Sequence, residues 1–161
     1  MNPGRCAAMT MMLALLPLVS SCTDSTSRES AAVFAEAGEK EFGGGMPVDT
    51  IEVARAAGYD YAKIVDGCLQ RDRQAMHTFF SLDGAAHFDA ASAQGHATVS
   101  GILLRRLGDP FFGECLAAEP PAVREAMQQH ILYDLGWGNT DETLAQLRQR
   151  YPRTLAGYEE E

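Results

Sequence analysis

The stretch Val99–Pro110, VSGILLRRLGDP, joins the apolar face of one helix to a turn and to the start of the next helix. Gly108 suits a left-handed C-cap, Asp109 suits an N-cap, and Pro110 suits the first turn of the following helix. We therefore expect a helix–turn–helix unit with a buried stripe. The residues of that stripe recur at the spacing of one helix face: Val99, Ile102, Leu103 and Leu107.

Outward from this unit, the chain after residue 30 shows helical periodicity and helix-capping residues. No segment shows the sustained alternation of apolar and polar residues that is typical of a strand. The sequence therefore predicts an all-α fold of six or seven short helices, as an orthogonal bundle or a stack of helix pairs. The expected helices span 31–42, 50–69, 73–82, 91–107, 110–118 and 121–135, and a last helix opens with the capping pair Asn139 and Glu142.

The first 22 residues have the parts of a bacterial export signal. Arg5 is basic, no acidic residue precedes Asp24, and the apolar run 7–19 is shorter than the roughly 20 residues that span a bilayer. The run ends in Leu18-Val19-Ser20-Ser21-Cys22, which resembles the lipobox of bacterial lipoprotein precursors. The alternative is an ordinary cleaved signal with an incidental cysteine at the junction.

The resemblance to lipoprotein precursors implies cleavage before Cys22 and lipid attachment to that cysteine. Thr23, and not Asp, follows it, which in proteobacterial relatives implies transfer to the outer membrane. We therefore expect a signal peptide at 1–21, a flexible tether at 22–30 and one helical domain at 31–161. Residues 31–42 are either part of its body or a loosely attached first helix.

The resemblance covers only residues 1–22, so it implies a location, the periplasmic side of the cell envelope, and no activity. Beyond it, the segment from Ala75 to Leu135 resembles only uncharacterised bacterial proteins that share a Gly-His and a later Gly-Asp-Pro-Phe. No activity follows from that second resemblance.

The composition limits the partners of the mature chain. Without Arg5, which the signal removes, 12 basic and 22 acidic residues remain, a net charge of −10 with histidine neutral. This balance argues against nucleic acid as a partner, because proteins that bind it carry a basic patch. It also excludes the basic cluster that presses some proteins onto anionic lipid. The expected partners are the membrane, through the lipid, and another envelope protein.

Two cysteines, Cys68 and Cys115, remain once Cys6 is removed with the signal and Cys22 carries lipid. Each follows the apolar stripe of an expected helix, so both point inward. In an oxidising compartment they could form a disulfide worth about 4 kcal/mol in the chain-entropy model. The alternative is two separate buried thiols that act as small hydrophobic residues.

The sequence offers few candidates for chemistry, and no coherent catalytic set, so neither an enzyme nor a bound cofactor is expected. A zinc site needs three or four converging ligands, and no two histidines have the i, i+4 spacing of a helical pair. His87, Asp89 and His96 are the residues of an alternative metal site. Tyr133, Trp137 and Asn139 are candidate binding residues, because Trp and Tyr are enriched in binding hot spots.

The sequence thus predicts a lipid-anchored periplasmic domain that binds another protein. A narrower alternative is an immunity-type inhibitor of a periplasmic toxin, since an acidic surface suits a basic active site. The alternative from another class is a small envelope enzyme that uses the His/Asp metal site.

Overall fold

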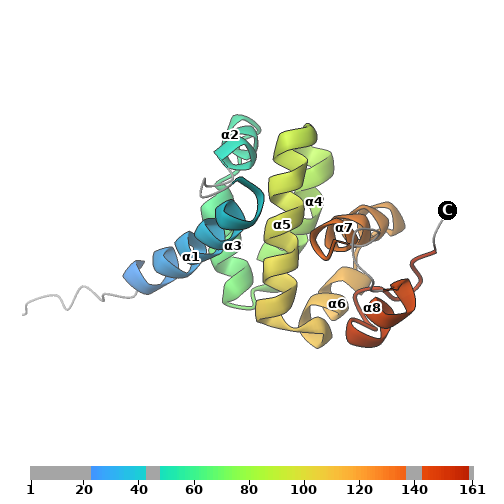
Figure 1. The fold of residues 1–161 in the computed structure, drawn as a ribbon. Helices are drawn as coiled ribbons and strands as arrows, with labels where there is room; N and C mark the ends of the chain where they lie inside the picture. The colour runs from blue at the N-terminus through green and yellow to red at the C-terminus, as the bar shows by residue number, and fades with distance from the viewer. Residues whose placement is uncertain (1–22, 43–47, 137–142, 160–161) are drawn as a thin grey trace, which may run out of the picture.

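The computed structural model describes residues 23–42, 48–136 and 143–159, which form eight helices and no strand (Figure 1). The expected all-α class is confirmed, with one helix more than the upper expectation. The helices are α1 (Thr23–Phe42), α2 (Val48–Ala56), α3 (Tyr61–Leu69), α4 (Arg73–Ala86), α5 (Ala90–Leu107), α6 (Asp109–Ala117), α7 (Pro121–Asp134) and α8 (Leu144–Arg150). Among these residues, no helix has the length and apolar character needed to cross a membrane.

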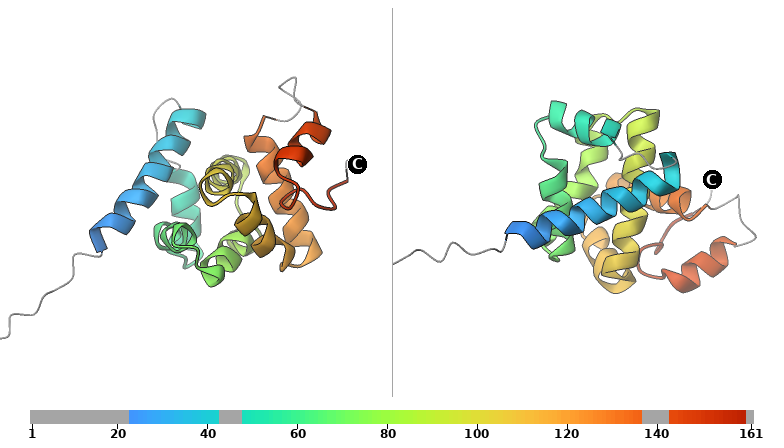
Figure 2. Two further views of the ribbon diagram at one scale, coloured as in Figure 1. Left: turned by 90° about the horizontal axis from the view of Figure 1, so that it is seen from below. Right: turned by 60° about the vertical axis from the view of Figure 1, so that its left-hand side comes forward.

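Helix α5 lies at the centre, and five helices pack against it: α1, α2, α3, α6 and α7. Figure 2 shows α1 on one side of α5 and α7 on the other. Every residue from Gly95 to Leu104 is buried, so this helix has no solvent-facing side over that length. Its small residues in this segment allow neighbouring helices to approach on several sides at once.

Apolar side chains from α1 to α7 form the main core. Aromatic rings contribute much of its volume, as in the edge-to-face pair of Phe80 and Phe112, whose centroids lie 5.1 Å apart. Such pairs add about 0.5–1.5 kcal/mol beyond the burial of their area. A second, smaller core joins α8 and the segment after it to α7 through Leu132, Leu147 and Leu155.

Helix α1 begins earlier than expected, and it belongs to the body of the domain, which was one of the two alternatives for its attachment. It begins at Thr23 and not at Ala31, so residues 23–30 are helical where a flexible tether was expected. It is also not loosely attached, because it packs on α3 and α5. Burial of Val33, Phe34 and Ala37 on one face explains why this helix is fixed to the body.

The single helix expected over residues 50–69 is two helices, α2 and α3. Gly58 takes a φ of +88°, a conformation that other residues rarely adopt, and it ends α2. Asp60 then N-caps α3, since its carboxylate accepts a hydrogen bond from the backbone N–H of Lys63 at 3.1 Å. The periodicity continues across the break, which is why the sequence pattern did not reveal it.

The turn at Gly108–Pro110 is confirmed, but the role predicted for Asp109 is wrong. Gly108 has a φ of +81° and is both the C-cap of α5 and the N-cap of α6. Asp109 makes no capping bond to its own helix. Its buried carboxylate accepts the backbone N–H groups of Arg153 and Thr154 at 3.0 and 2.9 Å, and so holds the segment after α8 on α6.

Two other helix boundaries also differ from the sequence expectation. Helix α4 does not end at Asp83-Gly84 but continues to Ala86. The start of α8 is capped by Thr143, whose hydroxyl accepts from the N–H of Gln146 while the Gln146 side chain accepts from Thr143. The pair expected to open this helix, Asn139 and Glu142, lies outside the described residues.

Helices α5 and α7 approach closely at Gly101. The carboxylate of Asp134, buried on α7, lies over this glycine and accepts a hydrogen bond from Arg105 at 2.6 Å. A Cβ atom added at Gly101 would lie 1.8 Å from Asp134 Oδ2. The contact between α5 and α7 therefore combines a glycine, which leaves room for the Asp134 carboxylate, with the ion pair between Asp134 and Arg105.

We predict that Gly101→Ala lowers the free energy of unfolding by about 3 kcal/mol, because it overpacks the contact and displaces a buried carboxylate from Arg105. Urea denaturation of both proteins measures the difference. Gly84→Ala on α4 is the matched control, since a Cβ there meets nothing within 4 Å. It should leave stability unchanged or raise it by up to about 1 kcal/mol. Equal effects of the two substitutions would contradict the close approach of α5 and α7.

Candidate functional site

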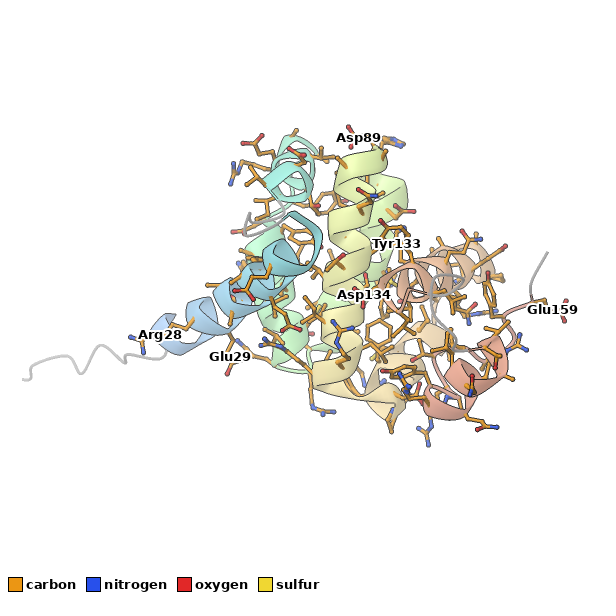
Figure 3. All side chains as sticks on the ribbon, viewed as in Figure 1. Arg28, Glu29, Asp89, Tyr133, Asp134 and Glu159 are labelled. Atoms are coloured by element: carbon orange, nitrogen blue, oxygen red, sulfur yellow. The ribbon has the colours of Figure 1, made fainter. Side chains whose placement is uncertain are left out.

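A groove runs between the first half of α5 and the second half of α7. Its volume is about 290 Å³. Tyr133 forms part of its wall, and half of the Tyr133 surface is accessible to solvent. The other residues that line the groove are Ala90, Ala93, Gln94, Ala97, Gln129 and His130. Tyr133 was a candidate binding residue in the sequence, and the structure places it at this groove (Figure 3).

The Tyr133 side chain is held in place by a neighbour on α5. Gln94 Nε2 donates a hydrogen bond to the Tyr133 hydroxyl at 2.7 Å, across the groove from one helix to the other. Aromatic side chains fixed in this way lose little conformational entropy when they bind a partner. Trp137 and Asn139, the other two candidate binding residues, lie outside the described residues.

His130 forms the inner wall of the groove and is mostly buried. Its Nε2 lies 3.8 Å from a carboxylate oxygen of Asp83, on the last turns of α4. Burial lowers the pKa of His130, and the Asp83 carboxylate raises it by a smaller amount. Sequence reasoning did not place Asp83 beside His130, because Asp83 comes from α4. The helical spacing of Ala90, Ala93 and Ala97 was the sequence feature that indicates a helix face of small residues, against which another helix can pack.

His96 lies in the core, next to this wall. It is fully buried, and its Nδ1 lies 2.8 Å from the Tyr61 hydroxyl. The rings of Phe79 and Phe88 lie 4.4 and 5.0 Å from its own. Desolvation, with a smaller contribution from His130, lowers the pKa of His96 well below its usual value. His96 is therefore neutral at pH 7.

Two buried nitrogens of this histidine pair make no hydrogen bond within the protein: His96 Nε2 and His130 Nδ1. The two rings pack edge to face with centroids 5.5 Å apart. The donor and acceptor roles of the Tyr61 hydroxyl and His96 Nδ1 follow the histidine tautomer: where Tyr61 donates, the proton of neutral His96 is on Nε2. Burial also raises the pKa of Tyr61, so this hydroxyl keeps its proton. His96 lies inside the core, while His130 reaches the wall of the groove.

The alternative metal site at His87, Asp89 and His96 is wrong. Within the described ranges, no three His, Cys, Asp or Glu side chains gather as a ligand set. His87 is exposed at the end of α4, with a φ of 53°, while His96 is enclosed by aromatic rings. The Asp89 carboxylate is occupied in capping α5, where it accepts from Ser92 N at 3.0 Å and Ser92 Oγ at 2.8 Å.

Cys68 and Cys115 are both buried, as expected, but the structure contains them as free thiols and not as the expected disulfide. Burial raises the pKa of both thiols, most strongly that of Cys68. Neither is therefore prepared to act as a nucleophile, which requires a thiolate. The arrangement agrees with the alternative of two small hydrophobic residues in the core.

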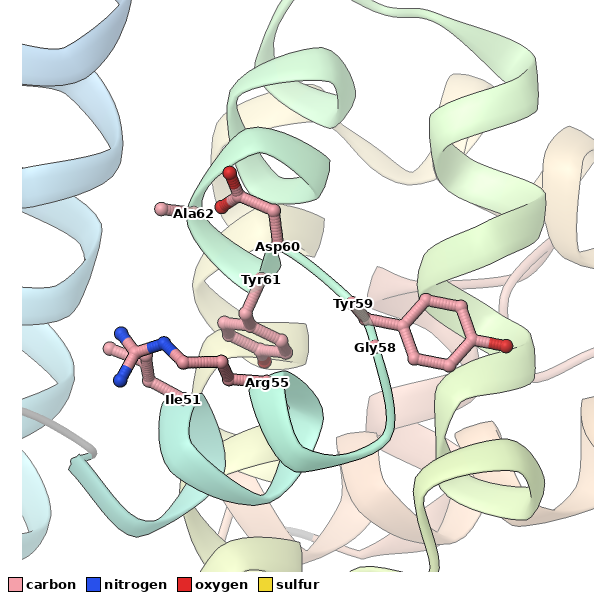
Figure 4. Close-up of a pocket in the computed structure, with 7 residues that line it drawn as sticks. All are labelled: Ile51, Arg55, Gly58, Tyr59, Asp60, Tyr61 and Ala62. Carbon is pink, nitrogen blue, oxygen red and sulfur yellow. The ribbon is translucent and has the colours of Figure 1, made fainter.

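A second hollow, of about 370 Å³, lies at the junction of α2 and α3 (Figure 4). Tyr59, Arg55 and Asp60 are among the residues that line it. Asp60 is already occupied as the cap of α3, and the Tyr61 hydroxyl is directed to His96 in the core. The hollow thus follows from the break between the two helices and presents no paired acid and base.

The buried histidines should make stability depend on pH. A histidine whose pKa is lower in the folded than in the unfolded state does not change the free energy of unfolding above about pH 6.5. Below that pH the unfolded chain takes up a proton that the folded protein does not, so the free energy of unfolding falls. We predict that His96→Asn reduces this acid dependence between pH 7 and 5 by as much as about 1.4 kcal/mol per pH unit. Denaturant unfolding at several pH values measures the slope.

His87→Asn is the matched control for this experiment, because His87 is exposed and asparagine tolerates its left-handed backbone. It should leave the slope unchanged. An unchanged slope in His96→Asn would show that His96 is protonated equally in the folded and unfolded states, contrary to its burial.

The buried thiols should resist alkylation. We predict that iodoacetamide labels Cys68 and Cys115 slowly in the folded protein and rapidly after unfolding without a reductant, since neither thiol is exposed or ionised. Peptide mass spectrometry reads each site separately. Labelling that requires a reductant even after unfolding would establish the disulfide instead, and rapid labelling of the folded protein would contradict the burial of both residues.

Comparison of this chain with protein-family models, with curated proteins and with solved structures found no significant match. No activity is therefore carried over from a relative. A helical fold alone does not define a function, so function has to be argued from the residues and their arrangement.

Proposed function

We propose that this protein is a bacterial lipoprotein, anchored through Cys22 on the periplasmic side of the cell envelope, that binds another envelope protein. The observation that carries the proposal is the sequence Leu18–Cys22 at the end of a short apolar run. Thr23 after the cysteine favours the outer membrane. Two or more acyl chains on one residue suffice for stable anchoring.

Features of the described residues support a binding role rather than catalysis. His96 is sealed in the core, and within the described residues no three His, Cys, Asp or Glu side chains gather as a ligand set. The exposed, hydrogen-bonded Tyr133 at a groove is instead typical of a recognition surface. In this proposal Tyr133 is the first contact to examine.

A narrower form of the proposal is an immunity-type inhibitor of a periplasmic toxin. The acidic balance of the chain favours it, because a negative surface accelerates association with a basic active site. Crosslinking of intact cells followed by purification should recover one specific partner. A toxin among the recovered proteins would select the inhibitor, and recovery of nothing above background would count against partner binding.

The anchor has a direct test. We predict that Cys22→Ser abolishes incorporation of labelled palmitate and leaves an uncleaved or misprocessed precursor, because the thioether forms on the sulfur that this change removes. Autoradiography and intact-mass measurement provide the two readouts. Cys6→Ser is the matched control, since it alters another cysteine of the precursor and should leave labelling intact. Labelling that persists in Cys22→Ser would refute the anchor and the proposed location.

A further inference from the structure

A pocket of about 300 Å³ lies where the end of α6, the first half of α7 and the segment after α8 meet. The residues that line this C-terminal pocket include Leu116, Ala117, Arg124, Gln128, Arg153 and Thr154. We propose that the C-terminal pocket binds a carboxylate group, held by Arg124, Arg153 and the Thr154 hydroxyl. A free small acid and an acidic side chain of a bound polypeptide both supply this group, and neither source requires the lipid anchor or the envelope partner.

The end of the chain around this pocket is basic, although the whole chain is acidic. From Thr143 to Tyr158 the sequence has three arginines and no acidic residue, whereas the chain of 161 residues has a net charge of −9. Arg153 belongs to this stretch, and Arg124 reaches the pocket from α7. Among the described residues, no Asp or Glu lines the C-terminal pocket. The charged groups of its wall are therefore cations, which select an anion.

Thr154 supplies a hydrogen-bonding group that has no partner in the protein. The residue is fully buried and lines the pocket, and its Oγ1 makes no hydrogen bond within the protein. Its backbone groups are satisfied, because the N–H donates to the Asp109 carboxylate at 2.9 Å and the carbonyl accepts from Gln128 Nε2 at 2.9 Å. A buried hydroxyl without a hydrogen bond costs free energy, so an oxygen atom of a ligand in the pocket is the partner that Thr154 lacks.

The segment that carries Arg153 and Thr154 is fixed against α6 and α7 without a ligand. Asp109 also accepts the backbone N–H of Arg153 at 3.0 Å, and Gln128 also donates to the Ala156 carbonyl at 3.0 Å. A Cβ atom added at Gly113 of α6 would lie 2.5 Å from Arg153 Cβ, so the segment lies directly on this helix. A site that is already ordered loses less conformational entropy when a ligand binds.

Arg124 is oriented by one hydrogen bond and keeps further donors. Its Nη1 donates to the backbone carbonyl of Glu119 at 2.7 Å. A guanidinium has five N–H groups in a planar fork, which matches the paired oxygens of a carboxylate or a phosphate. The bond to Glu119 uses one of these N–H groups, so the others are available to a ligand in the pocket.

Carboxylates beside the pocket favour a singly charged ligand over phosphate. Arg124 and Gln128 also line an adjoining hollow of about 350 Å³, whose wall includes Glu125 and Glu159. The Asp109 carboxylate lies behind the backbone of Thr154. The repulsion from these groups is proportional to the charge of the ligand, so a phosphate dianion meets about twice the repulsion that a carboxylate meets.

The experiment is an NMR titration of the ¹⁵N-labelled protein, produced from the full chain and kept in detergent micelles at constant ionic strength. The probes are acetate, N-acetylglutamic acid α-methylamide, its neutral glutamine counterpart and inorganic phosphate. We expect saturable shifts at the amides of Gln128, Thr154 and Ala156 with both carboxylates. The glutamine probe should bind about tenfold more weakly than the glutamate probe, which is the effect of two exposed ionic contacts. Phosphate should bind more weakly than acetate.

The two carboxylate probes distinguish the sources of the ligand. Equal binding of acetate and the glutamate probe would identify a free small acid as sufficient. Tighter binding of the glutamate probe would identify an acidic side chain of a polypeptide, because that probe carries peptide groups on both sides of the side chain.

Two variants test the assignment within the pocket. Thr154→Val removes the hydroxyl and keeps the shape, and it should weaken binding of both carboxylates about tenfold. Its urea midpoint should be unchanged or higher, because no hydrogen bond within the protein is lost. Arg153→Gln, at an exposed residue, should weaken binding about two- to fivefold. Arg28→Gln is the matched control: it makes the same change of charge on α1, at the opposite end of the molecule (Figure 3), and should have no effect.

Equal affinity for the glutamate and glutamine probes would overturn the proposal, and so would the absence of saturable shifts at the pocket. Tighter binding of phosphate than of either carboxylate would overturn the choice of ligand. Equal weakening by Arg153→Gln and Arg28→Gln would show a general attraction of anions to the surface and no site. A lower urea midpoint in Thr154→Val would show that the hydroxyl has a partner inside the protein, contrary to its proposed role.

Discussion

The structure depends on a helix that is buried on every side. From Gly95 to Leu104, α5 has no residue exposed to solvent, and helices from both ends of the chain pack on it. Such a helix needs small side chains where neighbouring helices approach closely. Its buried polar side chains also need hydrogen-bond partners within the protein. Gly101 meets the first need beneath Asp134, and Ser100 meets the second by donating to the His96 carbonyl at 2.7 Å. The positions of α1 and α7, and hence of the groove, follow from this packing.

The sequence predicted the helical class because the spacing of apolar residues and the positions of helix-capping residues agree over most of the chain. Asp72, which suits an N-cap in the sequence, caps α4, and Pro121 begins α7. The prediction from sequence failed where a residue interacts with a segment far away in the chain. Asp109 looks like a cap by position, yet its carboxylate holds the segment after α8. Residues 23–30 look like a linker by composition, yet they continue a helix that the burial of Val33 and Phe34 fixes to the body.

The candidate site was predictable only in part. Tyr133 was found from its residue type, but its partner Gln94 comes from α5, and a linear pattern does not show which helices meet. His96 illustrates the opposite error, because this histidine, a candidate metal ligand in the sequence, is a core residue hydrogen-bonded to Tyr61. With α1 beginning directly after Cys22, the proposed anchor would connect to the body through helix, which would hold the domain close to the membrane.

The claim that the rest of the fold is built on α5 is tested most directly by native-state hydrogen exchange. We expect the amides from Thr98 to Leu104 to exchange only through global unfolding, with the largest opening free energy in the molecule. Amides of α8 and the segment after it, which belong to the smaller core, should exchange at lower free energy. Exchange of the α5 amides through a local opening, at a lower free energy than that of α8, would contradict the account.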